Sequence, residues 1–394
     1  MPPWSVTTLF ATDCCRKAQS SYFKMPANGR GRRFREMRGA AVLIALAIMA
    51  VACAAPAGAF AREELSLACR SGARLAALAW GDARAPVRVL ALHGWMDNAA
   101  SFEALAPALA HGCRVVALDL PGHGRSPHAA CSAEYSAVEH AFSAYDALDA
   151  LGWLAPVPDA AGDGDGSGLV DGATPAPRAF SLLGHSLGGG IACLLASALP
   201  EQVRRLALVE GFGPLARPPE AFAAQLRDSL RKRHAAATGE HGPRERTYST
   251  LDEAAAARVN GAKRLPGKQF MSMGAARVLA ERGTVHVDAP GGGGARALRF
   301  SHDRRLAHPN AQAFHEEQIL NVLAAVSCPT MLVQARHGWP RPEPGFGERV
   351  RAMQPGLLTV VDLPEGSHYA HLDEETAAAV QRAIGPFLLE EDEG

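Results

Sequence analysis

Short apolar runs of strand length alternate with stretches of helical pattern between residues 64 and 211. Runs rich in Val, Leu and Ala predict strands at residues 87–92, 114–119, 179–183 and 204–209. Apolar residues at helical spacing predict helices at residues 99–110, 133–151 and 191–199. Because strand and helix alternate, we expect a mostly parallel sheet with helices on both faces.

The pattern continues on both sides of this region. Two strand-like runs before it, residues 64–72 and 74–81, are separated by Ser71-Gly72 and predict a hairpin. Beyond residue 322 the pattern predicts strands at 329–334 and 358–363 and helices at 347–353 and 375–389. We therefore expect one core domain built from residues 62–211 and 323–394.

Residues 212–322 interrupt the sheet pattern, because they are mainly helical and more basic than the rest. Helices are predicted at residues 221–232, 251–259 and 273–281. Since this block falls between two strands, we expect a helical lid over the carboxyl edge of the sheet. Its predicted contribution is a mainly apolar pocket, with these side chains as candidates: Phe222, Leu226, Phe270, Met271 and Met273.

The first 61 residues do not fit the core pattern. A basic run is followed by residues 39–61, which carry no charge and include a continuous apolar core. Three interpretations remain open: a cleaved signal peptide with an A-x-A-like site at residues 59–61, an uncleaved membrane anchor, or an organelle transit arm. An over-long start, with Met25 or Met37 as the true initiator, is a further alternative. Accordingly, the expected location is the secretory pathway, a membrane or an organelle.

A second irregular stretch, residues 158–177, is rich in Gly, Asp, Ala and Pro. It leads into the N-terminal end of the strand at 179–183, whereas ligands bind outside the carboxyl ends of strands. We expect a disordered insert that lies far from the chemistry.

Composition excludes some classes of partner. The 40 Lys and Arg residues balance 40 Asp and Glu residues, which argues against a nucleic-acid partner because phosphate contacts need a basic face. The eight cysteines show no C-x-x-C pairing, so we expect mostly buried thiols and neither a disulfide framework nor a metal site. Three lie in the first 61 residues, and the others are Cys69, Cys113, Cys131, Cys193 and Cys328.

The candidate chemistry centres on Gly184-His-Ser-Leu-Gly188, which fits G-x-S-x-G and lies between a predicted strand and a predicted helix. In a nucleophile elbow, the serine occupies a sharp strand-to-helix turn with a strained backbone. Ser186 Oγ is then exposed above the sheet, and the backbone N–H of Leu187 faces the same space. The alternative is a chance glycine-rich turn, which the flanking strand and helix disfavour.

Four motifs in order resemble the α/β-hydrolase fold: His93-Gly-Trp-Met-Asp, Asp119-Leu-Pro-Gly-His-Gly-Arg-Ser126, Gly184-His-Ser-Leu-Gly188 and Gly366-Ser-His368. Residues 63–390 look closest to the serine hydrolase-like proteins, which are relatives of the haloalkane dehalogenases and epoxide hydrolases. The resemblance implies a mostly parallel eight-stranded sheet with an inserted helical lid. A serine at 186 argues against the chemistry of those relatives, which form an ester on a carboxylate nucleophile.

The resemblance also implies roles for individual residues. Trp95 and Leu187 fall at the two positions whose backbone N–H groups form the oxyanion hole. His368 matches the catalytic base, and we prefer it to the nearby His371 because it directly follows the Gly-x turn. The segment 119–126 is a structural loop beside the pocket in that family.

The sequence departs from the family at the acid. An aspartate usually follows the seventh strand, but Gly338 stands at that position. Asp362 lies inside the last strand, and Glu343 lies in a Pro-rich loop with an extended, exposed path. Glu210 directly follows the strand at 204–209, where some dehalogenase-type relatives place their acid. We select Glu210 as the acid, with Glu343 as the alternative. A purely structural role for Glu210, capping the lid entrance or pairing with a lid arginine, also remains open.

These residues predict a serine hydrolase that cleaves a carboxylic ester or similar acyl substrate through an acyl-enzyme on Ser186. The alternative is a ligand-binding or sensor protein on the same fold with weak or no turnover, supported by the acid missing after the seventh strand. We expect a small-molecule acyl substrate, no cofactor and no metal. Membrane contact is expected only through residues 39–61.

Overall fold

The computed structural model describes residues 61–130, 133–155, 179–238, 246–289, 296–308, 310, 313–341 and 344–390. They belong to the second of two compact units, residues 59–394. The predictions for the N-terminal arm, for the insert at 158–177, for Cys131 and for Glu343 fall outside the described residues, apart from Ala61 at the end of the arm. Among the described residues, no helix has the length and apolar character needed to cross a membrane.

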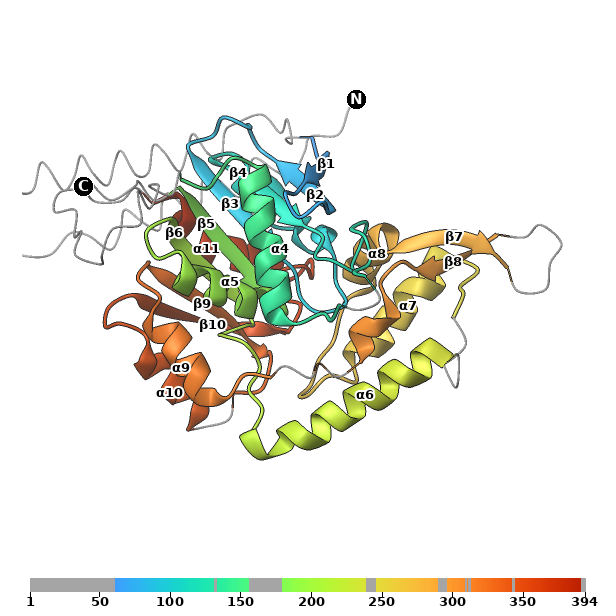
Figure 1. Cartoon of the computed structure of the whole chain (residues 1–394). Coiled ribbons are helices and arrows are strands. Elements are labelled where there is room, and N and C mark those ends of the chain that lie inside the picture. Colours follow the sequence, from blue (N-terminus) through green and yellow to red (C-terminus); the bar gives the residue numbers. More distant parts are fainter. Residues whose placement is uncertain are drawn as a thin grey trace, which may run out of the picture. The chain divides into compact units, whose positions relative to one another are not determined.

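Eight strands form one sheet in the order β1-β2-β4-β3-β5-β6-β9-β10 (Figure 1). Their bounds are β1 Glu63–Ala68, β2 Arg74–Trp80, β3 Val87–Leu92, β4 Cys113–Leu118, β5 Phe180–His185, β6 Val203–Val209, β9 Thr330–His337 and β10 Leu358–Ser367. Pairing is antiparallel only in β1–β2 and β2–β4, and parallel from β4 to β10. The mostly parallel sheet and the first hairpin are therefore confirmed.

The central strands are continuous apolar runs because both faces of the sheet are covered. All six residues of β5 are buried, and successive side chains point to opposite faces. Leu182 packs in the cluster on one face, and Leu183 packs in the cluster on the other face.

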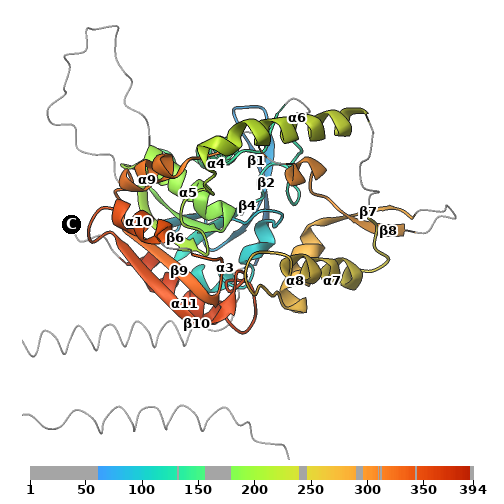
Figure 2. The same cartoon turned by 90° about the horizontal axis from the view of Figure 1, so that it is seen from below.

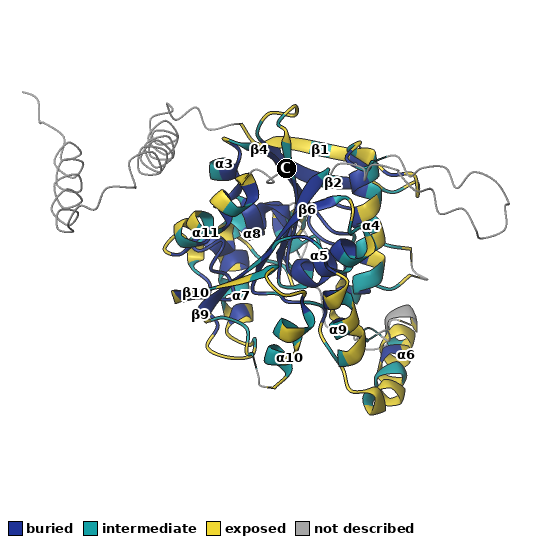
Figure 3. Ribbon diagram, turned by 90° about the vertical axis from the view of Figure 1, so that its left-hand side faces the viewer, coloured by how far each residue is buried: buried dark blue, intermediate teal, exposed yellow. Residues whose placement is uncertain are grey.

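Helices cover both faces, with buried inner sides and exposed outer sides (Figure 3). One face carries α4 Ala137–Ala150, α5 Leu187–Ala198, α9 Glu316–Ala324 and α10 Gly345–Ala352. The other face carries η2 Ala99–Phe102, α3 Ala106–Leu109 and α11 Ala377–Leu389. The helix predicted at 99–110 is thus two short pieces, since Pro107 cannot donate a backbone hydrogen bond to the preceding turn.

The segment between β6 and β9 holds α6 Phe222–Thr238, α7 Leu251–Ala262 and α8 Met273–Arg282. The helices α7 and α8 run side by side (Figure 2) and share an apolar cluster with Tyr369 and Leu372. An antiparallel ribbon, β7 Thr284–Asp288 and β8 Arg296–Phe300, was not predicted, because charged residues interrupt its apolar ones and nearly all of its residues are exposed or only half-buried.

The segment's C-terminal end differs from the sequence prediction. Helix α9 begins inside the range 212–322 and ends beyond it, and its Ile319 and Leu323 are fully buried in the main core beside α5 and α10. The described cysteines Cys69, Cys113, Cys193 and Cys328 are buried free thiols, as expected. Burial raises the pKa of the Cys113 and Cys193 thiols to about 12, which makes them unreactive.

Candidate active site

Ser186 occupies the turn between β5 and α5, with φ 52° and ψ −115°. The turn depends on close backbone approach. A Cβ atom at Gly188 would lie 1.9 Å from the carbonyl oxygen of Leu92, and one at Gly211 would lie 2.3 Å from the carbonyl oxygen of Ser186. Only glycine fits at these two positions, so they fix the path that presents Ser186.

Positive φ angles are concentrated here. Among the described residues, the non-glycine residues with positive φ are Met96, Ser186 and Glu210, and all three line the same cavity. Such conformations cost roughly 1–3 kcal/mol each and persist where the surrounding structure enforces them. Backbone strain therefore coincides with the site that the motifs indicate.

The His368 side chain meets Ser186 across the sheet edge. His368 Nε2 lies 2.8 Å from Ser186 Oγ, and the histidine is 4% exposed. His371 is also buried, but its Nε2 lies 2.7 Å from Ser101 Oγ instead. Of the two histidines weighed from the sequence, the structure brings His368 to the serine.

Glu210 follows β6 and points to the other ring nitrogen of His368. Its Oε2 lies 3.4 Å from His368 Nδ1. Its two oxygens also accept backbone hydrogen bonds from Ala335 and Trp339, each of 2.6 Å. Asp362 lies elsewhere: it pairs with Arg341 at 3.0 Å, and its side chain is 70% exposed.

The space beside Gly338 explains why a glycine stands at the position after the seventh strand where the family resemblance would place an aspartate. A Cβ atom at Gly338 would lie 2.2 Å from both carboxylate oxygens of Glu210. The Glu210 carboxylate therefore fills the volume that a side chain at 338 would need. The Glu210 carboxylate and a side chain at position 338 cannot occupy this space together.

Two backbone N–H groups border the same cavity. Leu187 is the first residue of α5, where an N–H has no intrahelical acceptor. Trp95 lies in a turn closed by a 3.1 Å hydrogen bond from Asp97 N–H to the Gly94 carbonyl. The Trp95 indole donates to the carbonyl of Leu306 at 3.0 Å, which ties this loop to the inserted segment.

Sequence reasoning missed a polar layer behind these residues. His185 Nε2 lies 2.9 Å from the carbonyl oxygen of His368, and its Nδ1 lies 3.6 Å from Asp97. Asp97 forms an ion pair with Arg258 of α7, and Arg258 also donates to the carbonyl of Met96 at 2.7 Å. His185 and Asp97 stand inside the recognised motifs, but no sequence pattern indicates Arg258.

Gln269 was also missed, and it bridges two parts of the site. Its Oε1 accepts a 2.9 Å hydrogen bond from the backbone N–H of His368. Its Nε2 donates to the carbonyl of Gly338 at 2.9 Å, next to the residue whose N–H binds Glu210. One buried amide thus fixes both the histidine loop and the turn that holds the carboxylate.

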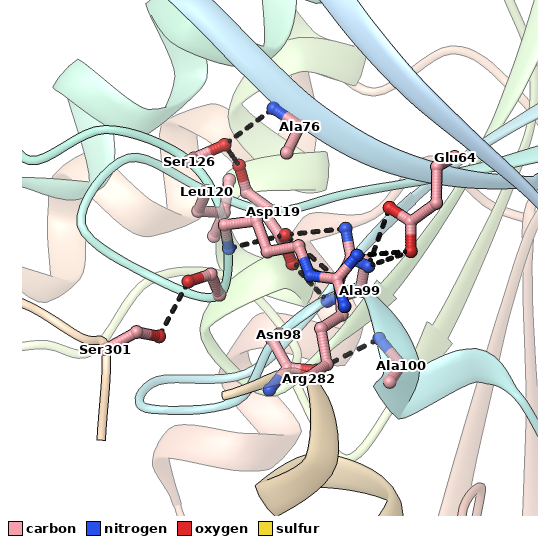
Figure 4. Close-up of polar contacts among 12 residues, drawn as sticks. Glu64, Ala76, Asn98, Ala99, Ala100, Asp119, Leu120, Ser126, Arg282 and Ser301 are labelled. Carbon is pink, nitrogen blue, oxygen red and sulfur yellow. Dashed lines mark hydrogen bonds and ion pairs between the residues drawn. The ribbon is translucent and has the colours of Figure 1, made fainter. Parts of the chain in front are cut away.

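The segment 119–126 makes structural contacts, as the sequence interpretation has it. Asp119 is fully buried and accepts hydrogen bonds from the backbone of Ala99 and Arg125 and from the Arg282 guanidinium (Figure 4). Arg282 also pairs with Glu64 at 2.9 Å. This network joins α8 of the inserted segment to β1 and β4 of the sheet.

A cavity of about 1420 Å³ opens above Ser186. The five side chains predicted to line it do not: Phe222, Phe270 and Met273 are exposed, Met271 is buried beside Tyr369, and Leu226 is absent from the lining. The residues that α6 and α7 contribute include Ala224, Gln225, Asp228, Lys232, Ala257 and Arg258, and the turn after α7 adds Arg264. The five candidate side chains are therefore wrong, because α6 turns a small and polar face to the cavity, but the lining as a whole is mainly apolar, as predicted.

Within the described part of the chain, no group of three or more His, Cys, Asp or Glu side chains is arranged to hold a metal ion. The chemistry available at this site is that of a serine hydroxyl, an imidazole, a carboxylate and backbone N–H groups.

Comparison with known proteins identifies the fold. A model described as the alpha/beta hydrolase family matches residues 89–382, which is most of the chain. The protein belongs to the alpha/beta hydrolase family. This confirms the resemblance inferred from the four motifs, and with it the fold class.

Relatives of this alpha/beta hydrolase include proteins described as serine hydrolase-like. The one from Dictyostelium discoideum is 26% identical over 346 residues, covering 84% of this chain and 82% of that protein. The one from Danio rerio is 27% identical and covers 78% and 86%. A solved hypothetical protein of Pseudomonas aeruginosa PAO1 superimposes with a TM-score of 0.66 at 32% identity, covering 84% of this chain and 99% of that chain.

Proposed function

We propose that this alpha/beta hydrolase is a serine hydrolase that cleaves a carboxylic ester or similar acyl substrate through an acyl-enzyme on Ser186. The observation that carries the proposal is the 2.8 Å contact between Ser186 Oγ and His368 Nε2 at the floor of a cavity. A hydroxyl within hydrogen-bond distance of an imidazole is the arrangement that activates a serine nucleophile.

The reaction has two steps. Ser186 Oγ attacks the acyl carbon while His368 Nε2 takes its proton, and His368 returns that proton to the leaving alcohol. Water then attacks the acyl-enzyme while His368 takes its proton, and His368 returns that proton to Ser186 Oγ as the bond to the acyl group breaks and the acid is released. In each step the developing oxyanion faces the Trp95 and Leu187 N–H groups, whose stabilisation is worth roughly 3–4 kcal/mol for one donor.

Glu210 is proposed as the acid. Its contact to Nδ1 orients the ring with Nε2 toward the serine and stabilises the imidazolium that forms. The two backbone hydrogen bonds to its oxygens hold the carboxylate in place. The ligand-binding alternative rested on the acid missing after the seventh strand, and the position of Glu210 weakens that argument.

The inserted helices α6 and α7 are proposed as the cap of this site. Both contribute side chains to the cavity above Ser186, and Arg258 and Gln269 tie the segment to the loops that carry Asp97 and His368. A cap in this position excludes water from the acyl group and selects substrates by shape.

Multiple-turnover hydrolysis of a short-chain p-nitrophenyl ester tests the proposal. We expect product to exceed the enzyme concentration many times over, in a linear steady state. Release of no more than one equivalent of p-nitrophenol would favour the ligand-binding alternative.

The pH dependence of kcat/KM should report on His368. Burial lowers the pKa of its imidazole below the ordinary value of 6.5, whereas the hydrogen bond that His368 Nδ1–H donates to Glu210 acts in the opposite direction. A base must be neutral, so activity is lost as pH falls through this pKa, and we expect the acid limb of kcat/KM below pH 6.5. Glu210→Gln removes an interaction that raises the pKa, and its residual activity should show an acid limb at still lower pH. An acid limb above 6.5 in the wild type would contradict this assignment.

Gln269→Leu should lower kcat by roughly 10–100-fold with little change in KM, because small displacements of reacting groups have effects of this size. Gln354→Leu is the matched control, since Gln354 is exposed and lies outside the cavity lining. Gln269→Glu retains an acceptor for the His368 N–H and adds a negative charge, so it should move the acid limb to higher pH. An unchanged kcat in Gln269→Leu would show that Gln269 does not position the site.

A further inference from the structure

The cavity lining carries more positive than negative charge. Five basic side chains line it: Arg217, Lys232, Arg258, Arg264 and Arg349. Three acidic side chains line it: Asp97, Glu210 and Asp228. A site for a purely apolar acyl group needs none of these cations, so the partner of each one indicates which charges are available to a ligand.

Two of the arginines are neutralised within the protein. Arg258 pairs with Asp97, and both side chains are nearly buried. Arg349 forms two hydrogen bonds to Glu316, of 2.6 and 2.8 Å, and donates to the carbonyl of Phe212. These two guanidinium groups serve the architecture of the cavity wall.

Arg217 and Arg264 are different. Backbone hydrogen bonds hold the main chain of both residues in place. The Arg217 N–H donates to the carbonyl of Phe314 at 2.8 Å, and the Arg264 N–H donates to the carbonyl of Gly261 at 3.0 Å. Neither guanidinium has an ion pair or a hydrogen bond to any described residue. Both side chains are exposed to solvent and still line the cavity, so they stand at its outer part.

The acidic residues do not compensate for these two charges. Asp97 pairs with Arg258, and Glu210 accepts two backbone hydrogen bonds and faces His368. Asp228 pairs with Lys232 at 3.1 Å, and both of those side chains are about half exposed. The outer cavity therefore has an excess positive charge, which concentrates anionic ligands.

We propose that the substrate carries an anionic group, a carboxylate or a phosphate, that binds in the positively charged outer part of the cavity, where Arg217 and Arg264 supply the available guanidinium groups. This inference rests on the proposed ester hydrolysis and names the substrate class. A guanidinium presents paired N–H donors that match both anions. The cavity, at about 1420 Å³, exceeds the roughly 300–1,000 Å³ of an ordinary ligand site, which leaves room for an acyl chain and a charged end.

The anion can belong to the acyl chain or to the leaving group. Three substrates with a six-carbon acyl chain separate these sources: neutral p-nitrophenyl hexanoate, the mono-p-nitrophenyl ester of adipic acid with a free carboxylate, and hexanoyl-coenzyme A with phosphates on the leaving group. At low salt, we expect at least one of two kcat/KM ratios to be roughly ten or more. The first ratio compares the adipate ester with the hexanoate ester. The second compares the coenzyme A thioester with a neutral hexanoyl thioester.

The double variant Arg217→Gln/Arg264→Gln should reduce this preference by roughly tenfold, as should raising the ionic strength. Using ratios within one preparation corrects for any loss of folded protein. Arg351→Gln is the matched control, because Arg351 is an exposed arginine of α10 that does not line the cavity, and it should keep the preference. Equal rates on neutral and anionic substrates, or a preference that survives in the double variant, would overturn the inference and leave the hydrolase proposal intact. Absence of hydrolysis of all the substrates would contradict the hydrolase proposal itself.

Discussion

Ser186→Ala should lower kcat for ester hydrolysis by roughly 10⁶-fold, the order seen when a serine nucleophile is removed. The Ser186 oxygen is the atom that forms the acyl-enzyme. Among the hydrogen bonds between described residues, Ser186 Oγ is the partner of His368 Nε2, at 2.8 Å. Steady-state kinetics with a p-nitrophenyl ester measures the loss. The folded structure should survive, because alanine removes one oxygen at the cavity floor.

Ser197→Ala is the matched control for this variant. Ser197 lies on the same helix, α5, and its hydroxyl donates within the helix to the Leu194 carbonyl at 2.8 Å. Its kcat should stay close to that of the wild type. Turnover retained in Ser186→Ala, above the level of contaminating esterases, would show that the nucleophile lies elsewhere.

Glu210→Gln should reduce kcat by roughly 10⁴-fold, as loss of a triad carboxylate does. An amide at this position offers no negative charge to the imidazolium of His368. The carboxylate oxygens accept hydrogen bonds from two backbone N–H groups, and the NH₂ group of the glutamine would face one of these donors. Near-wild-type turnover in this variant, with a large loss in Glu343→Gln, would assign the acid to Glu343 instead.

The geometry at Gly338 permits a stricter test by moving the acid. Glu210→Gly empties the carboxylate's space and tolerates the φ of 56° at this position. Adding Gly338→Asp then directs a new carboxylate into that space, and the φ of Gly338 lies outside the positive range that disfavours side chains. The double variant should recover at least roughly tenfold in kcat over Glu210→Gly, a part of the roughly 10⁴-fold loss.

The single variant Gly338→Asp is the control for the relocation. Its Cβ atom would lie 2.2 Å from both Glu210 oxygens, so the two groups cannot keep their positions together. We expect it to lose activity even though it adds a carboxylate. Wild-type activity in Gly338→Asp, or no gain in the double variant, would contradict the assignment of the acid to this space.

Much of the fold was predictable because the core elements carry strong local signals. The buried strands are continuous apolar runs, and glycines flank Ser186 where backbones approach within van der Waals distance. Strand ends also place motifs that are distant in sequence at one edge of a parallel sheet. That is why the structure brings together Ser186, His368 and Glu210, all chosen from sequence.

The inserted segment was predicted less well, because tertiary contacts determine which of its side chains line the cavity. Phe222 and Leu230 of α6 are exposed, and the helix faces the cavity with Ala224, Gln225 and Asp228. A sequence shows that a helix has an apolar side but does not show which side meets the pocket. Gln269 has no signal at all, since its role depends on two loops that are separated from it in the sequence.

Covalent labelling of the nucleophile tests most directly whether Ser186 is an activated serine. The wild type is treated with a fluorophosphonate, which reacts with activated serine hydroxyls, and the digested protein is mapped by mass spectrometry. We expect one adduct, at Ser186 on the peptide that contains Gly184-His-Ser-Leu-Gly188, and no adduct in Ser186→Ala. An adduct on another residue, or labelling that survives in Ser186→Ala, would show that Ser186 is not the nucleophile.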